Sequence, residues 1–243
     1  MRIVSLLVGL MLATNVGAQP AIEFVVSAAP GGPNDTVTRK LVEKLEKYTS
    51  LKFIVLNKAG AAHIIGYNHV LNSDKPTLIM STPEITNHDV YPTLDEVYNA
   101  GYFSNTLFVS KKSSIKSIRE LADLSNTREI VFGHGGVGTY SHQAMQSMCE
   151  KTLRCLDVAY KGGSQGMLAL MSGEIDAYAI TTYGTKQFFE NSTLVPIHNI
   201  KFPKEKTWFK LFAKNISNSD QEIIAIALKS QHFKFYTDMG FEK

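Results

Sequence analysis

The sequence predicts an α/β protein of two lobes, each built on a mainly parallel sheet that helices flank. Short apolar segments of strand character alternate with amphipathic segments of helical spacing, which is the pattern of parallel strands joined by crossover helices. This alternation runs through the chain twice, and one further strand and helix follow it. A chain of 243 residues is long enough for two small hydrophobic cores. We therefore expect two lobes joined by crossing segments.

The first series of elements predicts the first part of lobe I, over residues 19–104. Apolar residues recur at the spacing of one helix face between residues 35 and 48, which predicts a helix there. A second helix is expected from Ala59 through Leu71. Short apolar runs predict three strands, at residues 22–26, 53–56 and 77–81.

The second series predicts lobe II, over residues 105–200, after which residues 201–243 return to lobe I. Strands are expected where apolar runs are bounded by turn residues, at 106–110, 129–132, 156–160, 175–180 and 194–199. Helical spacing predicts helices at 115–124, 141–149 and 165–171. The tail predicts a strand at 208–213 and a helix at 219–229.

Residues 1–18 have the pattern of a secretory signal peptide. Arg2 supplies a positive charge, an apolar stretch runs from residue 3 to 13, and small residues end at Ala18. The apolar stretch is too short to span a bilayer as a mature helix. We therefore expect cleavage near Ala18 and export of the mature chain to the periplasm.

Composition narrows the possible partners. The formal net charge is only +3, and the basic residues form no block that could follow a nucleic-acid backbone, so nucleic acid is not an expected partner. The two cysteines, Cys149 and Cys155, are six residues apart. In an oxidising compartment such a pair can form a local disulfide, but backbone geometry decides whether it does. From the sequence, Cys149 and Cys155 can be either disulfide-bonded or free thiols.

Two glycine-rich turns, each placed after a strand and before a helix, are the candidate ligand site. The first covers residues 30–35 and the second covers residues 135–142. Glycine lets the backbone approach a ligand and adopt positive φ, so that consecutive N–H groups can point at one atom. The helix N-terminus behind each turn adds a partial positive charge. One such turn per lobe predicts a site for a small carboxylate, with no lysine or arginine needed.

The role of Asp35, inside the first turn, stays open. Its negative charge would repel a carboxylate directly. The helix dipole favours an acidic residue in the first turn of a helix, so Asp35 is expected to hold the loop or to contact the ligand through a water molecule or an amino group.

Other chemistries are disfavoured by residue spacing. No dinucleotide or nucleotide-triphosphate glycine motif is present, so no such cofactor is expected. The histidines show no spacing typical of a metal site. Ser141 beside His142 raises a secreted hydrolase as an alternative. Adjacent residues at a helix start point in different directions, however, and a general base must reach the proton of its nucleophile. We therefore expect that this protein is not an enzyme.

Several segments occur together in an order and spacing that resemble one protein family. They lie within residues 22–180 and comprise 29–35 with Arg39 and 41–45, 57–62 with Gly66, 133–142, 160–164 and 173–177. Residues 208–213 look like the family's late strand. On these segments the chain is similar to the extracytoplasmic solute receptors of tripartite tricarboxylate transporters, the Bug-type family.

The resemblance implies a two-lobed periplasmic-binding-protein (Venus-flytrap) fold that closes on a small carboxylate, such as an organic acid, a dicarboxylate or an amino acid. It implies a monomer that passes this ligand to integral membrane transporter subunits, and a receptor coupled to signalling stays open as an alternative. The turns and the resemblance together predict these ligand-contact residues: Pro30, Gly31, Gly32, Asn34, Asp35, Ser81, Thr82, Gly136, Val137, Gly138, Thr139, Tyr140, Ser141, His142, Gly162, Gly163 and Thr181.

The chain departs from the family pattern in two respects. The region after Ile180 is compressed, and the sequence ends at Lys243 soon after one predicted helix, so helices that wrap back over lobe I are expected to be short or absent. His134 and Tyr140 are bulkier than the small residues that the family often has at these places, which bears on the size of the ligand.

Overall fold

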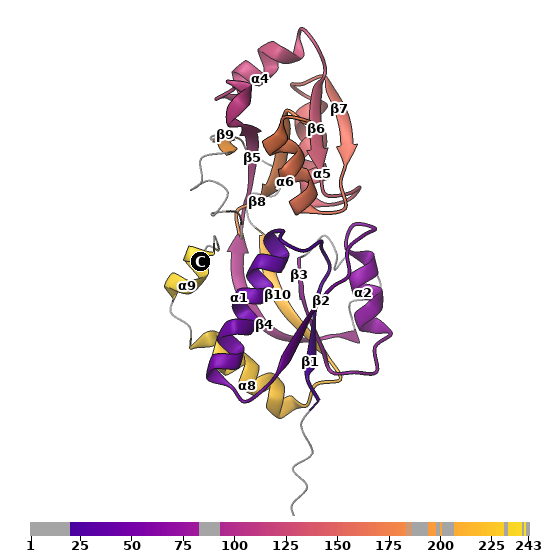
Figure 1. Cartoon of the computed structure of the whole chain (residues 1–243), viewed down its shortest axis with the longest axis vertical. Coiled ribbons are helices and arrows are strands. Elements are labelled where there is room, and N and C mark those ends of the chain that lie inside the picture. The colour runs from indigo at the N-terminus through magenta and orange to yellow at the C-terminus, as the bar shows by residue number, and fades with distance from the viewer. Residues whose placement is uncertain are drawn as a thin grey trace, which may run out of the picture.

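The protein folds into two lobes, each with its own five-stranded sheet (Figure 1). The structure is a computed structural model that describes residues 20–82, 93–183, 185, 194–197, 200, 207–230, 233–239 and 241. The predicted signal peptide, residues 1–18, lies outside them. No helix in the described part of the chain has the length and apolar character needed to cross a membrane.

The sheet of lobe I has the strand order β2-β1-β3-β10-β4. Its strands are β1 (Ile22–Val26), β2 (Phe53–Asn57), β3 (Thr77–Ser81), β4 (Asp95–Phe103) and β10 (Thr207–Lys214). β1 pairs in parallel with β2 and β3, whereas β10 is antiparallel to both β3 and β4. The helices of this lobe are α1 (Pro33–Tyr48), α2 (Ile64–Leu71), α8 (Asn218–Lys229) and α9 (Phe233–Asp238).

Alternate residues of β1 supply two separate cores on the two faces of this sheet. Phe24 packs in the cluster that contains Leu41 of α1 and Ile224 of α8. Its neighbour Val25 packs with Val70 of α2 on the other face. Successive side chains of a strand point to opposite faces, so a strand covered on both sides is buried at successive positions and is mostly apolar. All five residues of β1 are buried accordingly.

The sheet of lobe II has the order β7-β6-β8-β5-β9. Its strands are β5 (Asn105–Ser110), β6 (Ile130–His134), β7 (Cys155–Ala159), β8 (Ala177–Thr181) and β9 (Leu194–Ile197). β6 is parallel to β7 and β8, and β5 is antiparallel to β8 and β9. A short 3-10 helix, η2 (Lys111–Ser113), follows β5. The helices are α4 (Ile118–Ser125), α5 (Tyr140–Cys149) and α6 (Gly163–Ser172).

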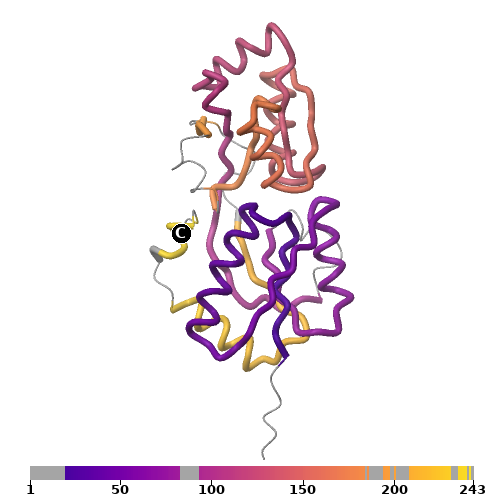
Figure 2. Tube along the Cα trace, in the orientation of Figure 1, coloured from indigo at the N-terminus to yellow at the C-terminus, as the bar shows by residue number. Residues whose placement is uncertain are grey.

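Segments that cross between the lobes lie side by side at the junction, as the tube in Figure 2 shows. Only Ser104 separates β4, in the first sheet, from β5, in the second. The Thr182 N–H donates to Ser104 O at 2.8 Å, and the Ser104 N–H donates to Thr182 Oγ1 at 3.3 Å. These bonds tie the end of β8 to the β4–β5 crossing and define a narrow junction.

The structure confirms the α/β class and adds three features. Each sheet is mixed, because β10 and β5 run antiparallel to their neighbours. β4 is absent from the sequence prediction because its segment, Asp-Glu-Val-Tyr-Asn-Ala-Gly-Tyr-Phe, has no continuous apolar run and only two buried residues, and it is held by pairing with β10. A second C-terminal helix, α9, follows α8 where only one was expected.

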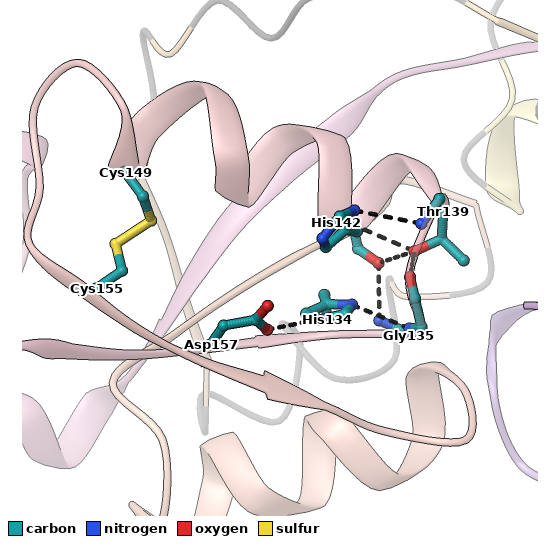
Figure 3. Close-up of polar contacts among 10 residues, drawn as sticks. His134, Gly135, Thr139, His142, Cys149, Cys155 and Asp157 are labelled. Atoms are coloured by element: carbon teal, nitrogen blue, oxygen red, sulfur yellow. Dashed lines mark hydrogen bonds and ion pairs between the residues drawn. A yellow bond between two sulfur atoms is a disulfide. The ribbon is translucent and has the colours of Figure 1, made fainter.

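Cys149, at the end of α5, and Cys155, at the start of β7, are joined by a disulfide bond. The bond lies beside the lobe II core and closes the turn between α5 and β7 (Figure 3). It holds the C-terminal end of the helix that begins at the second glycine-rich turn.

Candidate functional site

A cleft with two adjoining compartments lies between the lobes. The inner compartment, of ≈ 70 Å³, is lined by residues of both lobes, including Asn34, Thr82, Asn105 and Ser141. The outer compartment, of ≈ 380 Å³, opens between residues 60–64 of lobe I and residues 135–137 of lobe II. Three residues line both, namely His63, Gly135 and Gly162.

The N-termini of three helices converge on the inner compartment. α1 contributes Pro33 and Asn34, α5 contributes Tyr140 and Ser141, and α6 contributes Gly163. The first N–H groups of a helix have no partner within the helix, and they carry the positive end of its dipole. Anions therefore bind favourably at such ends. Both lobes supply this positive potential to one cavity.

Two polar side chains of the inner compartment have no hydrogen-bond partner among the described residues. They are Thr82 Oγ1, just after β3, and Asn105 Oδ1, at the start of β5. Thr82 is only 4% exposed. Since a buried polar atom without a partner costs about 1–3 kcal/mol, these two groups are suited to hydrogen bonds with a bound ligand or water.

The amides of the second glycine-rich turn bond to side chains of their own lobe. The Gly135 N–H donates to Ser141 Oγ at 2.9 Å, and the Gly136 N–H donates to His134 Nδ1 at 3.1 Å. The Gly138 N–H donates to His142 Nδ1 at 3.2 Å. These three donors are therefore already used, contrary to the expectation that they face a ligand.

The first turn is held in the same way by Asp35. Its Oδ2 accepts from the Gly31 N–H at 2.9 Å and from Arg39 Nε at 3.0 Å, and its Oδ1 accepts from Asn57 Nδ2 at 2.9 Å. Burial raises the pKa of Asp35, but the bonds from Arg39, Gly31 and Asn57 outweigh it, so the net shift is downward. Of the two roles considered for Asp35, the structure favours holding the loop.

Asn34 joins lobe I to the β8 end of lobe II. Its Oδ1 accepts a hydrogen bond from the Tyr183 hydroxyl at 2.5 Å. The Tyr183 ring is buried and stacks on Phe209 and Phe241 of lobe I, with centroids 4.6 Å and 5.3 Å away. Asn34 and Tyr183 both line the inner compartment, so this contact joins two parts of its wall.

The structure brings many of the predicted contact residues together and leaves others outside the two compartments. The inner compartment contains Asn34, Thr82, Thr139, Tyr140, Ser141, Gly162, Gly163 and Thr181. The outer compartment contains Gly136 and Val137. The predicted residues that line neither are Pro30, Gly31, Gly32, Asp35, Ser81, Gly138 and His142.

His63 and Asn105 are among the polar cleft residues that sequence reasoning missed. His63 follows a run of small residues, and no local pattern marks it as a cleft residue rather than a helix residue. Asn105 lies at the lobe junction and is the first residue of β5. A polar residue at the entry of a strand with an apolar centre is the signal that could have indicated it.

His134, His142 and Asp157 form a cluster with metal-ligand spacing in the part of the chain that the structure describes (Figure 3). One ligand atom of each lies within 4.8 Å of the others. Asp157 Oδ1 is 2.5 Å from His134 Nε2, although the geometry is not that of a hydrogen bond. Nδ1 of His134 and Nδ1 of His142 each accept a hydrogen bond from a backbone N–H, so each neutral ring carries its proton on Nε2. This tautomer disfavours metal ligation through Nε2.

Ser141 is held by groups other than a histidine. Its Oγ accepts from the Gly135 N–H, lies 2.9 Å from Thr139 Oγ1 and bonds to the buried Tyr178 hydroxyl. His142 Nδ1 instead accepts from Gly138. Within the described residues, no imidazole is hydrogen-bonded to Ser141, so the geometry does not support the hydrolase alternative.

Stability is expected to fall on mild acidification, in part through His142. Burial and the nearby His134 lower the pKa of His142, while Asp157 opposes them. As the pH falls below the pKa of an unfolded histidine, about 6.5, His142 takes up a proton more readily in the unfolded chain than in the folded one. The free energy of unfolding therefore decreases. Urea unfolding at pH 7.5 and 5.5 should show a smaller loss of stability for His142→Gln than for the wild type. Equal pH dependence of the two proteins between these values would contradict this assignment.

A strained segment forms the lobe I wall of the outer compartment. Ala61, Ala62 and His63 have φ of 47°, 48° and 78°, and each lines this compartment. Residues with a Cβ adopt the left-handed region at a cost of roughly 1–2 kcal/mol each. Such strain is concentrated at functional sites.

Replacing Ala62 by glycine is therefore expected to raise the free energy of unfolding by up to about 1 kcal/mol, because glycine adopts positive φ without steric cost. Denaturant unfolding measures the change. Ala59→Gly is the matched control, since Ala59 is not among the described residues with positive φ, and it is expected to destabilise. A stability loss of equal size for both variants would contradict the strain.

Residues 37–200 match the family described as Tripartite tricarboxylate transporter family receptor. A UPF0065 protein from the tcbD-tcbE intergenic region of Pseudomonas sp. (strain P51) is 29% identical over 169 residues, 64% of this chain and 50% of that protein. BugT of Bordetella pertussis is 25% identical over 173 residues, 64% of this chain and 53% of BugT. The chain thus spans about half the length of the curated relatives it matches.

Solved structures share the fold at low sequence identity. The periplasmic binding protein BugD has a TM-score of 0.76 and 18% identity, with 90% of this chain and 85% of BugD covered. MatC of Rhodopseudomonas palustris, solved with bound malate, has a TM-score of 0.74 and 18% identity, with 90% of this chain and 88% of MatC covered. An adipate-bound R. palustris protein has a TM-score of 0.77 and 18% identity, with 90% of this chain and 87% of that protein covered.

The fold, the cleft between lobes and the family match agree with the resemblance drawn from the sequence segments. The match covers residues 37–200, which is more than half of the 243-residue chain. The chain belongs to the receptor family of the tripartite tricarboxylate transporters.

Proposed function

We propose that this chain is an exported periplasmic receptor that binds a small carboxylate between its lobes and delivers it to the integral membrane subunits of a tripartite tricarboxylate-type transporter. The observation that carries the proposal is the convergence of three helix N-termini on one cavity that also contains the unpaired Thr82 Oγ1 and Asn105 Oδ1. Such a cavity offers an anion the hydroxyl of Thr82 as a donor and the positive potential of the helix ends, while Asn105 Oδ1 can accept from a hydroxyl or a water molecule.

The hydrogen-bond donors available to the carboxylate differ from the glycine-turn amides that the sequence suggests. With the amides of Gly31, Gly135, Gly136 and Gly138 already bonded, the ligand would be held by first-turn amides of α1, α5 and α6 and by the hydroxyl of Thr82. The glycines serve to bring the helix ends close. Gly162, for example, has φ of 129° as the N-cap of α6 and lies against Ala29 of lobe I.

The energy available from such a site is sufficient for useful affinity. Hydrogen bonds to a charged group contribute about 1.5–3 kcal/mol each. Four or five of them approach the roughly 8 kcal/mol of micromolar binding once the cost of ordering the ligand is subtracted. Hinge closure of the lobes would complete the site.

Relatives support the class of ligand. One R. palustris structure was solved with adipate and MatC was solved with malate, both of which are dicarboxylates. We carry the class, an organic acid with one or two carboxylates, to this chain. Delivery to membrane subunits rests on family membership, and co-purification of the mature chain with membrane proteins tests it against a signalling partner.

Thermal unfolding with a panel of mono-, di- and tricarboxylates and amino acids tests binding. At least one acid should raise the Tm saturably, because a ligand that binds only the folded state stabilises it. Asn105→Asp places a negative charge in the inner compartment and should weaken binding at least about tenfold. Asn126→Asp, at the exposed end of α4, is the matched control. Failure of every acid to stabilise the wild type would overturn the proposal.

A further inference from the structure

His63 occupies an unusual place at the centre of the cleft. It lines both compartments, at the point where Gly135 and Gly162 of lobe II face lobe I. It is the N-cap residue of α2 in the left-handed conformation, with φ of 78° and ψ of −13°, and its side chain makes no cap hydrogen bond. Histidine is not among the residues preferred at an N-cap, and the left-handed conformation has a steric cost for any residue with a Cβ. The local cost points to a role in the cleft.

The hydrogen bonds of His63 define its tautomer. Nδ1 is 2.9 Å from the carbonyl oxygen of Ser27 and 3.1 Å from Ser27 Oγ. A carbonyl oxygen can only accept, so Nδ1 carries a proton and donates it. In a neutral ring the other nitrogen, Nε2, is then an acceptor.

The ring of His63 is held neutral at pH 7. Burial lowers the pKa of His63, and the bond to Ser27 opposes that effect only in part. His63 makes its described hydrogen bonds through Nδ1, and Nε2 is not among the solvent-inaccessible atoms without a partner. Within the described residues, Nε2 is therefore an accessible acceptor without a partner.

We propose that His63 makes this cleft selective for carboxylates that also carry a hydroxyl or amino donor, which Nε2 accepts. The inference rests on the proposed function and refines its ligand class. Helix N-termini supply donors for the carboxylate, and the imidazole supplies an acceptor on the lobe I wall. An acid without a donor leaves Nε2 unpaired when the lobes close, which lowers its affinity relative to a hydroxy acid.

Matched pairs of acids test the proposal by isothermal titration calorimetry, with malate against succinate and lactate against propionate. For any pair that binds, the hydroxylated member should bind the wild type about tenfold more tightly, the effect of pairing one buried acceptor. In His63→Gly the preference should fall to within about twofold. Glycine suits the positive φ at this position, so this variant is expected to fold.

His69→Gln is the matched control, because His69 lies on α2 beside Glu23 and outside both compartments. It should keep the wild-type preference. Equal wild-type affinity for both members of a pair that binds, or a preference that survives in His63→Gly, overturns the role of His63 while carboxylate binding stands. Absence of binding by every acid overturns the proposed function instead.

A spectroscopic measurement tests the premise without any ligand. A two-bond ¹H–¹⁵N NMR spectrum of the histidine rings, assigned with His63→Gly, reports which ring nitrogen carries the proton. We expect His63 to be protonated on Nδ1 alone at pH 7. Protonation on Nε2 would overturn the proposal.

Discussion

Replacing Asp35 by alanine is expected to lower the free energy of unfolding by about 3 kcal/mol and to abolish measurable carboxylate binding. The carboxylate is 5% exposed and accepts from Gly31, Arg39 and Asn57. Arg39 is half exposed and can return to water. The Gly31 N–H and the Asn57 amide instead lose a partner, at about 1–3 kcal/mol each. Binding is lost because the turn that positions Asn34 at the cavity loses its anchor.

Urea unfolding and calorimetry with an acid that binds the wild type measure these effects. Asp123→Ala, on the exposed face of α4, is the matched control and should change stability by less than about 0.5 kcal/mol. Asp35→Asn keeps the size of the side chain and should lose less stability than Asp35→Ala. If Asp35→Ala unfolded like the wild type, the anchoring role would be wrong.

The contribution of Asp35 has a defined pH dependence. Its pKa is lowered in the folded state, so its stabilisation is present above the pKa of an unfolded aspartate, about 3.9, and is lost as the pH falls further. The His142 effect acts at higher pH, below about 6.5. Acidification should therefore weaken the protein in two separable steps.

The strands that the sequence predicted best are those buried on both faces. β1 and β3 match their predicted ranges, because a strand between two helical layers is buried on both faces and its sequence is mostly apolar. β4 has no such signal. Only two of its nine residues are buried, and it forms because β10 pairs along it, with β-bulges. β10 lies about a hundred residues further along the chain. Pairing over that distance leaves no local trace in the sequence.

The candidate site shows the same division between local and long-range information. The positions of the glycine turns follow from local residues, since each turn joins a strand to a helix. The direction of their amides does not, because it depends on which side chain captures each N–H. Asp35, His134, His142 and Ser141 all do so. An acceptor four to six residues beyond a glycine, as Asp35, Ser141 and His142 are, is a signal that the amide is already used.

Gly166→Ala is expected to lower the free energy of unfolding by about 3 kcal/mol, although alanine is the better helix former. A Cβ at Gly166, inside α6, would overlap Cε2 of Tyr178 and lie 2.6 Å from Cζ of the same ring. The Tyr178 ring is 1% exposed in the lobe II core, and its hydroxyl bonds to Ser141. The ring cannot move without disturbing Ser141 and the inner compartment, so carboxylate affinity should fall as well.

A double-mutant cycle separates this steric contact from a general weakness of α6. In the Tyr178→Ala background the added methyl group has space, so Gly166→Ala should be neutral or should stabilise by up to about 1 kcal/mol, the difference in helix propensity. A cost of about 3 kcal/mol in both backgrounds would show that Tyr178 is not the contact. With the expected result, Gly166 is required because a tyrosine that supports the ligand cavity packs directly against the helix backbone.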